Sequence, residues 1–126
     1  MTAVLTPRKP RSVLAVSSSR RPHPTLVMAV SGTLDAETRA AFVDYVAETL
    51  RARPATRALI LDLTELGHLS ESGSRVIDRA RRHLERRGVR VAVVAEPGSI
   101  VADAVGPVRA YDTRRAAIAG QTRPAA

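Results

Sequence analysis

Short apolar runs in this chain alternate with longer segments in which apolar residues recur every three or four positions. Residues 12–17 and 25–31 are predicted to form two strands, and the polar connection between them suits a loose hairpin. Residues 58–63 and 89–95 are continuous apolar runs, which are typical of strands covered on both faces of a sheet. Residues 108–111 are expected to form a last short strand.

Amphipathic helices are predicted between these strands. One apolar stripe, over residues 36–52, follows Asp35, which is a good N-cap residue, and a second, over residues 71–87, follows Ser70. Gly88 supplies the C-cap of the second helix, whose outer face is expected to carry ion pairs. These pairs are Glu71–Arg75, Asp78–Arg82 and Arg81–Glu85. Two further short helices are expected over residues 99–105 and 113–119.

The predicted order of elements is β-β-α-β-α-β-α-β-α, which indicates a single α/β domain with a mixed sheet flanked by helices. This domain is expected to span residues 12–119. Residues 1–11, with two prolines and three cations, are expected to form a disordered basic arm, and residues 120–126 a disordered tail. In such sheets, functional sites lie at the carboxyl ends of strands. The corresponding loops cover residues 31–36, 62–73 and 95–99.

The composition is that of an ordinary globular domain and excludes several kinds of site. Of the 126 residues, 44% are hydrophobic and 25% are charged. The absence of cysteine excludes disulfides and cysteine nucleophiles, and an aromatic content of 2% argues against platforms that stack on single-stranded nucleic acid. No apolar run is long enough to span a membrane, and the N-terminus lacks the apolar stretch of a signal peptide, so a cytoplasmic protein is expected.

The net charge of +8 comes almost entirely from arginine, and its distribution is uneven. The basic residues are 19 arginines and one lysine. The first eleven residues carry +3 and Arg123 adds one more, so residues 12–118 carry +4. A high isoelectric point favours solubility and electrostatic steering before it indicates a site, so direct nucleic-acid binding is not expected.

Signatures of catalysis and of metal binding are missing from the sequence. His23, His68 and His83 lack the spacing of metal ligands, and there is no glycine-rich phosphate loop or Gly-x-Ser-x-Gly motif. Asp62 follows a strand, as catalytic acids often do, but no base or nucleophile lies near it in sequence, so a structural role is expected. The protein is therefore expected not to be an enzyme and to need neither a cofactor nor a metal.

Residues 62–73 are the segment with the clearest candidate chemistry. After a buried strand, residues 64–69 are expected to form a loop, and a helix then begins with hydroxyl residues and Gly73. A helix N-terminus presents free amide groups and a positive dipole end, so it favours a phosphate or another anion. The alternative is an ordinary capped helix in which Ser70 is the cap, Glu71 favours the dipole and Gly73 allows close packing.

This segment resembles the signature of the STAS domain, the fold of anti-sigma-factor antagonists. In that family a strand ends in Asp-Leu-Ser, and an Asp-Ser-(Ser or Thr)-Gly motif opens the next helix. Here the strand ends Asp-Leu-Thr at residues 62–64, and the helix opens Ser-Glu-Ser-Gly at residues 70–73. Residues 31–35 resemble the family's Gly-x-Leu-Asp element, and residues 111–117 resemble the start of its closing helix. The similarity extends in unbroken order over residues 12–119.

The resemblance implies a binding function that is controlled by phosphorylation. Members of the family bind an anti-sigma factor, often a serine kinase, and so release the sigma factor that it holds. The kinase phosphorylates the first hydroxyl residue after the motif's Asp, and a phosphatase reverses this. Carried over to this chain, the Asp position is Ser70, the phosphoacceptor position is Glu71, the next hydroxyl is Ser72 and the glycine is Gly73. The usual acceptor is therefore missing, and Ser72 or Ser74 would have to substitute for it.

The charge of the motif places this chain between the two states of the family's switch. The unmodified family motif carries about −1 from its Asp, and phosphorylation adds about −1.5 to −2. Ser70 and Glu71 together carry −1. By net charge the site matches the unmodified state, whereas by the position of its carboxylate it partly matches the modified one.

The predicted function is protein binding in a sigma-factor regulatory pathway, by partner switching without the usual serine. The resemblance implies an anti-sigma factor or a serine-kinase-like protein as the partner. The implied partner surface comprises Thr33, Asp35, Ser70, Glu71, Ser72, Gly73, Ser74, Arg75 and Arg79. Arg75 and Arg79 lie one turn apart, and they either meet an acidic partner or form solvated ion pairs with Glu71 and Asp78.

Two alternative functions follow from the same residues. One is a STAS-like accessory or ligand-sensing subunit of a transport or signalling complex. The other is a nucleic-acid-associated protein that uses the basic arm, which predicts salt-dependent binding that weakens when residues 1–11 are removed. The oligomeric state does not follow from the sequence.

Overall fold

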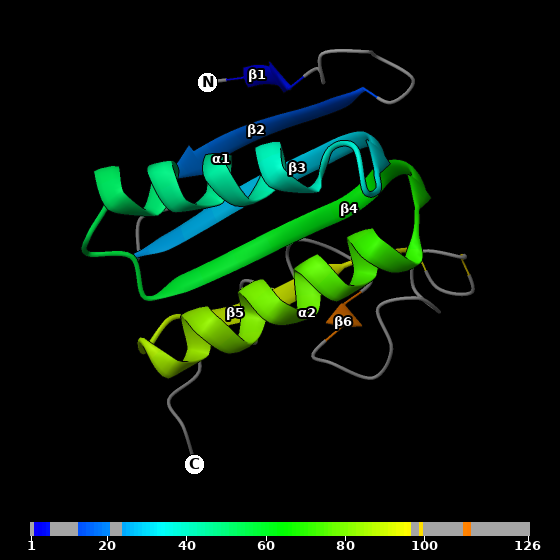
Figure 1. Cartoon of the computed structure of the whole chain (residues 1–126). Helices are drawn as coiled ribbons and strands as arrows, with labels where there is room; N and C mark the ends of the chain where they lie inside the picture. Colours follow the sequence, from blue (N-terminus) through cyan, green and yellow to red (C-terminus); the bar gives the residue numbers. More distant parts are fainter. Residues whose placement is uncertain (1, 6–12, 21–23, 97–98, 100–109, 112–126) are drawn as a thin grey trace.

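One mixed sheet organises the part of the chain that the computed structural model describes, which comprises residues 2–5, 13–20, 24–96, 99 and 110–111. Six strands lie in the order β1-β2-β3-β4-β5-β6 (Figure 1). The strands are β1 (Thr2–Leu5), β2 (Leu14–Arg20), β3 (Thr25–Leu34), β4 (Ala58–Leu69), β5 (Arg90–Val94) and β6 (Ala110–Tyr111). The helices described are α1 (Arg39–Ala52) and α2 (Glu71–Arg86).

One strand of this sheet, β2, runs opposite to the other five. The pairs β1–β2 and β2–β3 are antiparallel, and the pairs β3–β4, β4–β5 and β5–β6 are parallel. Helix α1 connects β3 to β4, and α2 connects β4 to β5, so both are crossovers in the same direction and lie on one face of the sheet (Figure 1). The predicted α/β class and mixed sheet are confirmed.

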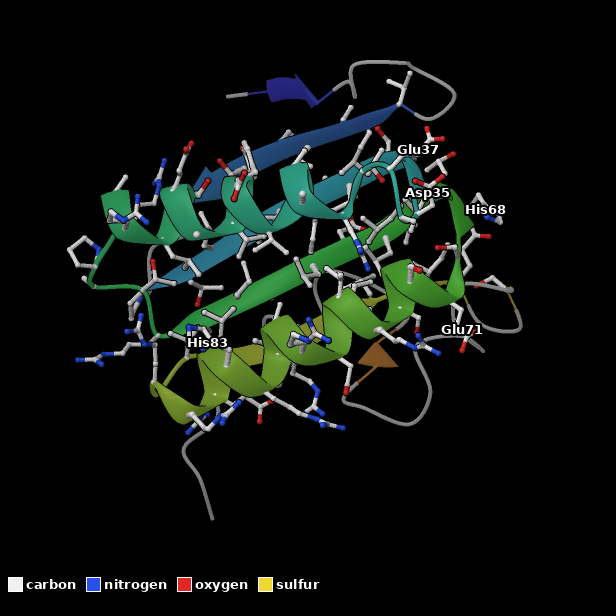
Figure 2. The ribbon with its side chains drawn as sticks, viewed as in Figure 1. Asp35, Glu37, His68, Glu71 and His83 are labelled. Carbon is white, nitrogen blue, oxygen red and sulfur yellow. The ribbon has the colours of Figure 1, made fainter. Side chains whose placement is uncertain are left out.

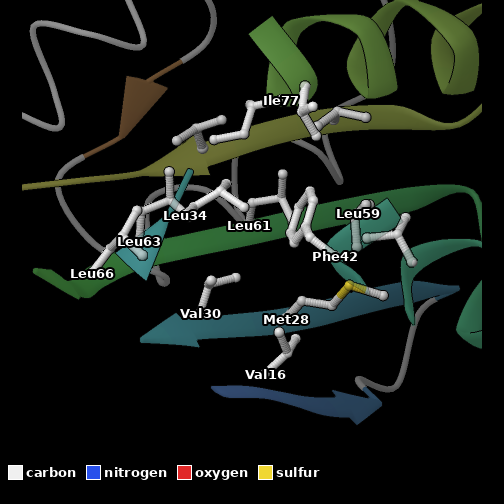
Figure 3. Packing of buried hydrophobic residues seen from close by; sticks show 14 of the residues in the cluster. Val16, Met28, Val30, Leu34, Phe42, Leu59, Leu61, Leu63, Leu66 and Ile77 are labelled. Atoms are coloured by element: carbon white, nitrogen blue, oxygen red, sulfur yellow. The ribbon is translucent and has the colours of Figure 1, made fainter. Parts of the chain in front are cut away.

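The core lies between this face of the sheet and the two helices. Phe42 of α1, which is fully buried, and Ile77 of α2 pack with Met28 and Leu61 of the sheet in one cluster (Figure 3). Burying a side chain of this size contributes about 1.5–3 kcal/mol. A second cluster lies on the face of the sheet opposite the helices, and each of its residues is at most 1% exposed. Because this cluster includes a residue of β4, the prediction that β4 is covered on both faces is confirmed. Its members are Val27, Ile60, Ala92 and Val94.

The start of the chain differs from its prediction. Residues 1–11 are predicted to be a disordered arm, and for residues 2–5 this is wrong, because they pair with β2, with Thr2 opposite Ser17 and Leu5 opposite Leu14. The free edge of β2 offers unpaired backbone groups, and the apolar stretch that ends in Leu5 suits a strand. The three cations of the arm come after this stretch in sequence.

Strand β4 is longer than predicted. Residues 64–69 are predicted to be a loop, but they continue β4 and stay paired with β3 as far as Leu69, which lies opposite Leu34. The pairing survives because β4 holds one extra residue at each of two register shifts and because Leu66 and Leu69 are buried. The two strands therefore end side by side, directly before Asp35 and Ser70 of the predicted partner surface.

The remaining predictions concern the ends of the chain. Strand β6 confirms the end of the strand predicted over residues 108–111. The helices predicted over residues 99–105 and 113–119, Ser99 apart, lie outside the described residues, as do the tail and His23. None of the helices described is both long and apolar enough to cross a membrane.

Candidate functional site

The two segments predicted to form the site meet at the carboxyl ends of β3 and β4. Leu34 ends β3 opposite Leu69, and the amide of Ser70 donates to the carbonyl oxygen of Leu34 at 3.0 Å. The turn that leads to α1 begins directly after Leu34. The site therefore has a scaffold of paired backbone on which two helix starts lie together. Figure 2 shows the side chains at this end of the molecule that it labels, which are Asp35, Glu37, His68 and Glu71.

Helix α2 begins with the predicted cap. Ser70 has an extended backbone, and its hydroxyl accepts from the amide of Gly73 at 3.1 Å. The Ser70 carbonyl accepts from the amide of Ser74 at 2.9 Å, which closes the first turn. Glu71 lies in that first turn, where a carboxylate favours the positive end of the helix dipole. The expected role of Ser70 is confirmed.

Gly73 lets α2 begin directly against the end of β3. The residue is buried, and a Cβ built on it would overlap the carbonyl oxygen of Leu34 and lie 2.9 Å from a methyl carbon of Leu69. A backbone carbonyl cannot move aside as a flexible side chain can. The close packing expected of Gly73 is therefore confirmed, and it fixes where the residues of the first turn of α2 point.

Helix α1 begins differently from its prediction. It is predicted to start at residue 36 with Asp35 as its N-cap, but the helix starts at Arg39 after a turn. One Asp35 carboxylate oxygen accepts from the amides of Glu37 (2.9 Å) and Thr38 (3.2 Å). The Thr38 hydroxyl donates to the carbonyl of Thr33 at 2.9 Å and accepts from the amide of Asp35 at 3.0 Å. With the Arg39 amide, which donates to the Asp35 carbonyl at 2.9 Å, these bonds cap the turn that leads into α1. The prediction was therefore right about the capping bonds of Asp35 but placed the helix start three residues too early.

The carboxylate of Glu71 is presented to solvent. Its side chain is 81% exposed, and it forms an ion pair with Arg75, whose side chain is 70% exposed. A surface pair at this spacing contributes about 0.2–0.5 kcal/mol, so a partner protein can compete for either side chain at little cost. The three ion pairs predicted on the outer face of α2 are all present.

The sequence and the element order identify the family. A family model of the STAS domain matches residues 17–104. The chain belongs to the STAS domain family. The predicted resemblance is therefore confirmed. Among curated proteins, no sequence matches this STAS domain.

Solved structures agree with that assignment. An anti-sigma factor antagonist from Mycobacterium paratuberculosis is similar with a TM-score of 0.71 and 17% identity, over 87% of this chain and 95% of that one. A serine-to-glutamate variant of RsbS from Moorella thermoacetica is similar with a TM-score of 0.69 and 16% identity, over 84% and 93%. The anti-sigma factor antagonist SpoIIAA in its unphosphorylated form gives a TM-score of 0.64 and 18% identity, over 82% and 92%. At these identities the likeness establishes the STAS fold.

Most of the surface implied by the sequence comes together in this STAS domain. Thr33 and Asp35 lie beside the start of α2, where residues 70–75 follow one another through the first turn and beyond. Ser72 and Ser74 are both half-buried there. Leu34, whose carbonyl joins the two segments, and Thr38, whose hydroxyl shapes the first, were missed by the sequence reasoning. A threonine three residues after Asp35 is the signal that could have revealed that turn.

Of the residues predicted for the partner surface, Arg79 lies away from the start of α2. It lies about two turns along α2 and lines a groove between α1 and α2. The Asp78 carboxylate pairs with Arg81 and Arg82, both at 2.9 Å, so the predicted alternative of an Arg79–Asp78 pair is not what the structure has. The hydrogen bond to Asp78 raises the pKa of the Arg81 guanidinium above its ordinary value.

The other candidate residues have roles that do not suggest chemistry. Asp62 is 6% exposed, and its carboxylate accepts from the amide (3.0 Å) and the hydroxyl (2.7 Å) of Thr64, which supports the expected structural role. His68 and His83 are exposed, and His83 lies at the opposite end of the molecule (Figure 2). Within the residues that the structure describes, no group of three potential metal ligands gathers.

Proposed function

We propose that this STAS domain binds an anti-sigma factor and regulates a sigma factor by partner switching that lacks the usual serine switch. The observation that carries the proposal is the start of α2. There the position that corresponds to the family's phosphoacceptor holds Glu71, largely exposed, directly after the capping Ser70. Two of the similar solved structures are anti-sigma factor antagonists, which favours this kind of partner.

The rigidity of the site supports a binding role. Ser70 is tied to Leu34 by its amide and to Gly73 by its hydroxyl, and Gly73 itself is packed against the end of β3. A surface that is already ordered loses little conformational entropy when a partner docks.

The charge at Glu71 supports a site with one fixed state. A phosphoserine carries about −1.5 to −2 at neutral pH and is removed by a phosphatase, whereas a glutamate carries a single permanent charge. In the proposed mechanism, the carboxylate of Glu71 stays in the interface in every condition. The fraction of anti-sigma factor that is bound is then set by the concentrations of the two proteins rather than by a kinase.

The test uses purified kinase-type anti-sigma factors encoded in the same genome. Their binding to the full chain is measured by calorimetry with ADP and after incubation with ATP, for the wild type and for Glu71→Ser. We expect the wild type to bind equally with either nucleotide. We expect Glu71→Ser to be phosphorylated at position 71 and then to bind at least about tenfold more weakly, a change of about 1.4 kcal/mol.

Glu48→Ser is the matched control, because Glu48 is an exposed glutamate on α1. It should bind as the wild type does and take no phosphate. Failure of the wild type to bind any of these proteins would reject the sigma-factor role. Phosphorylation of wild-type Ser72 or Ser74, with loss of binding, would show instead that the acceptor has moved and that the switch is intact.

A further inference from the structure

A groove of about 690 Å³ runs between α1 and α2, away from the site described above. Its α1 side extends from Val43 to Arg51 and its α2 side from Val76 to Arg87, which is about 12 Å and 16 Å of helix. Pro54 and Arg57, which follow α1, also line it. The groove is therefore elongated along both helices, from the second turn of each to its C-terminal end.

The floor of the groove is apolar. It includes Val46 and Leu84, which are buried, and the short side chains of Ala47 and Ala80, which leave the space between the helices open. Val43 is 44% exposed at its edge, and it is one of two large hydrophobic side chains that are exposed among the described residues. The other, Val13, is not among the residues that line the groove.

The rim of the groove is strongly basic. The described lining contains six arginines and one histidine but no aspartate or glutamate. The arginines are Arg51, Arg53, Arg57, Arg79, Arg86 and Arg87. The ion pairs found among the described residues involve Arg75, Arg81 and Arg82, and none of the six. Cations near a helix C-terminus favour its dipole, which accounts for Arg51 and Arg86 but not for Arg57 or Arg79.

We propose that this groove binds an amphipathic helical segment of a partner protein, with aspartate or glutamate beside its apolar face. An apolar floor between two helices suits the helix-in-groove mode, and two to three turns of a third helix match its length. Six arginines in a described lining that contains no carboxylate supply the charge complementarity that selects an acidic partner. This surface goes beyond the proposed anti-sigma function and does not depend on Glu71.

Other anionic partners fit less well. The described lining contains no phenylalanine, tyrosine or tryptophan on which bases could stack, and an apolar floor gains nothing from a phosphate backbone. A lipid surface is flat, whereas the apolar residues here lie between two helices. Nucleic acid and membrane therefore enter as outcomes that the experiment distinguishes.

The test selects ligands from a displayed library of random peptides, about four helical turns long, on the full chain, with counter-selection on Val43→Asp. We expect enriched peptides to carry apolar residues at helical spacing with acidic residues at their flanks. The best peptide is then synthesised with a fluorophore, and its affinity is measured by anisotropy. Val43→Asp should weaken it by at least about tenfold, because the new carboxylate lies against the peptide's apolar face and repels the acids that flank it.

Two matched controls isolate the groove. Val13→Asp adds the same carboxylate at the other exposed valine and should change the affinity by less than about twofold. Arg79→Ala should weaken binding by about 3–10-fold and Arg82→Ala by less than about twofold, although both remove one charge from α2. Should Val43→Asp unfold, Ala47→Glu, on an exposed lining residue, takes its place.

Three results would overturn the proposal. Enriched peptides could lack acidic residues, or bind Val43→Asp as well as the wild type. Alternatively, a DNA duplex or phosphatidylglycerol vesicles could bind through Arg79 and Val43 while no peptide does. Glu71→Ser should leave peptide affinity unchanged, so failure of this proposal and failure of the proposed function are separable.

Discussion

The starts of α1 and α2 both lie next to Leu34, α1 through the turn that follows it in sequence and α2 through Gly73, but they use their polar groups in opposite ways. Before α1, the Thr38 hydroxyl is fully buried and the Asp35 carboxylate accepts from two amides of its own turn. Before α2, one hydroxyl and one glycine suffice, and the carboxylate of Glu71 stays in solvent. The polar groups before α1 thus form hydrogen bonds within the scaffold, whereas the first turn of α2 presents the Glu71 carboxylate to solvent.

The substitution with the largest expected effect removes the close approach at the second start. Gly73→Ala adds a methyl group that overlaps the Leu34 carbonyl, and we expect it to lower the free energy of unfolding by about 2–3 kcal/mol despite the better helix propensity of alanine. Urea unfolding followed by circular dichroism measures this. Gly67→Ala is the control, since its methyl group would lie 3.5 Å from the Gly32 oxygen, an ordinary contact. Equal stability of the two variants would show that α2 can shift along β3.

A smaller loss is expected when the first start is broken. Thr38→Val keeps the shape of the side chain but leaves the Thr33 carbonyl and the Asp35 amide without this partner, which should cost about 1.5 kcal/mol. Thr49→Val, which removes a bond from a half-buried threonine to the carbonyl of Tyr45 in α1, should cost less than about 0.5 kcal/mol. Similar losses in both would contradict a special role for the turn.

The cap of α2 should matter less than either of these. Ser70→Ala removes the acceptor for the Gly73 amide and should cost about 1 kcal/mol in thermal or urea unfolding. Ser70→Asp, which restores the residue of the family motif, should unfold as the wild type does because Asp caps as well as Ser. A large loss in Ser70→Asp would mean that the Glu71 carboxylate repels a second charge at this point.

The smallest effect on stability is expected for the exposed side chain of Glu71. Glu71→Gln removes the ion pair with Arg75 and should change stability by about 0.2–0.5 kcal/mol at low salt and by less in high salt. Urea titrations at two salt concentrations measure this. A loss as large as that of Ser70→Ala would show that Glu71 belongs to the scaffold, which would remove the contrast between the two helix starts.

Local rules predicted the second helix start better than the first. The Ser70 cap and the ion pairs of α2 depend on residues within four positions of one another, and all are confirmed. The turn at Asp35 also depends on the Thr38 hydroxyl, which reaches back to Thr33 in β3. Such a side-chain hydrogen bond is invisible to a search for apolar stripes.

Pairing between distant segments explains the other differences. Strand β1 forms because β2 has a free edge, and β4 continues past residue 63 because β3 continues beside it. The groove between α1 and α2 likewise requires two helices that are not adjacent in sequence. The available signal was the clustering of arginines around the end of each helix, with Arg51, Arg53 and Arg57 at the first and Arg86 and Arg87 at the second. Because the two helices run parallel, these separate groups of arginines line one groove.

Helix α2 contributes residues both to the predicted partner surface at Glu71 and to the groove between α1 and α2. Its 16 residues span about 24 Å, with Glu71 at the beginning and Arg86 at the end. The groove lining begins at Val76, next to Arg75, so the two proposed partners would lie side by side along one helix. In that arrangement a single copy of the chain would act as a bridge that raises the effective concentration of one bound protein near the other.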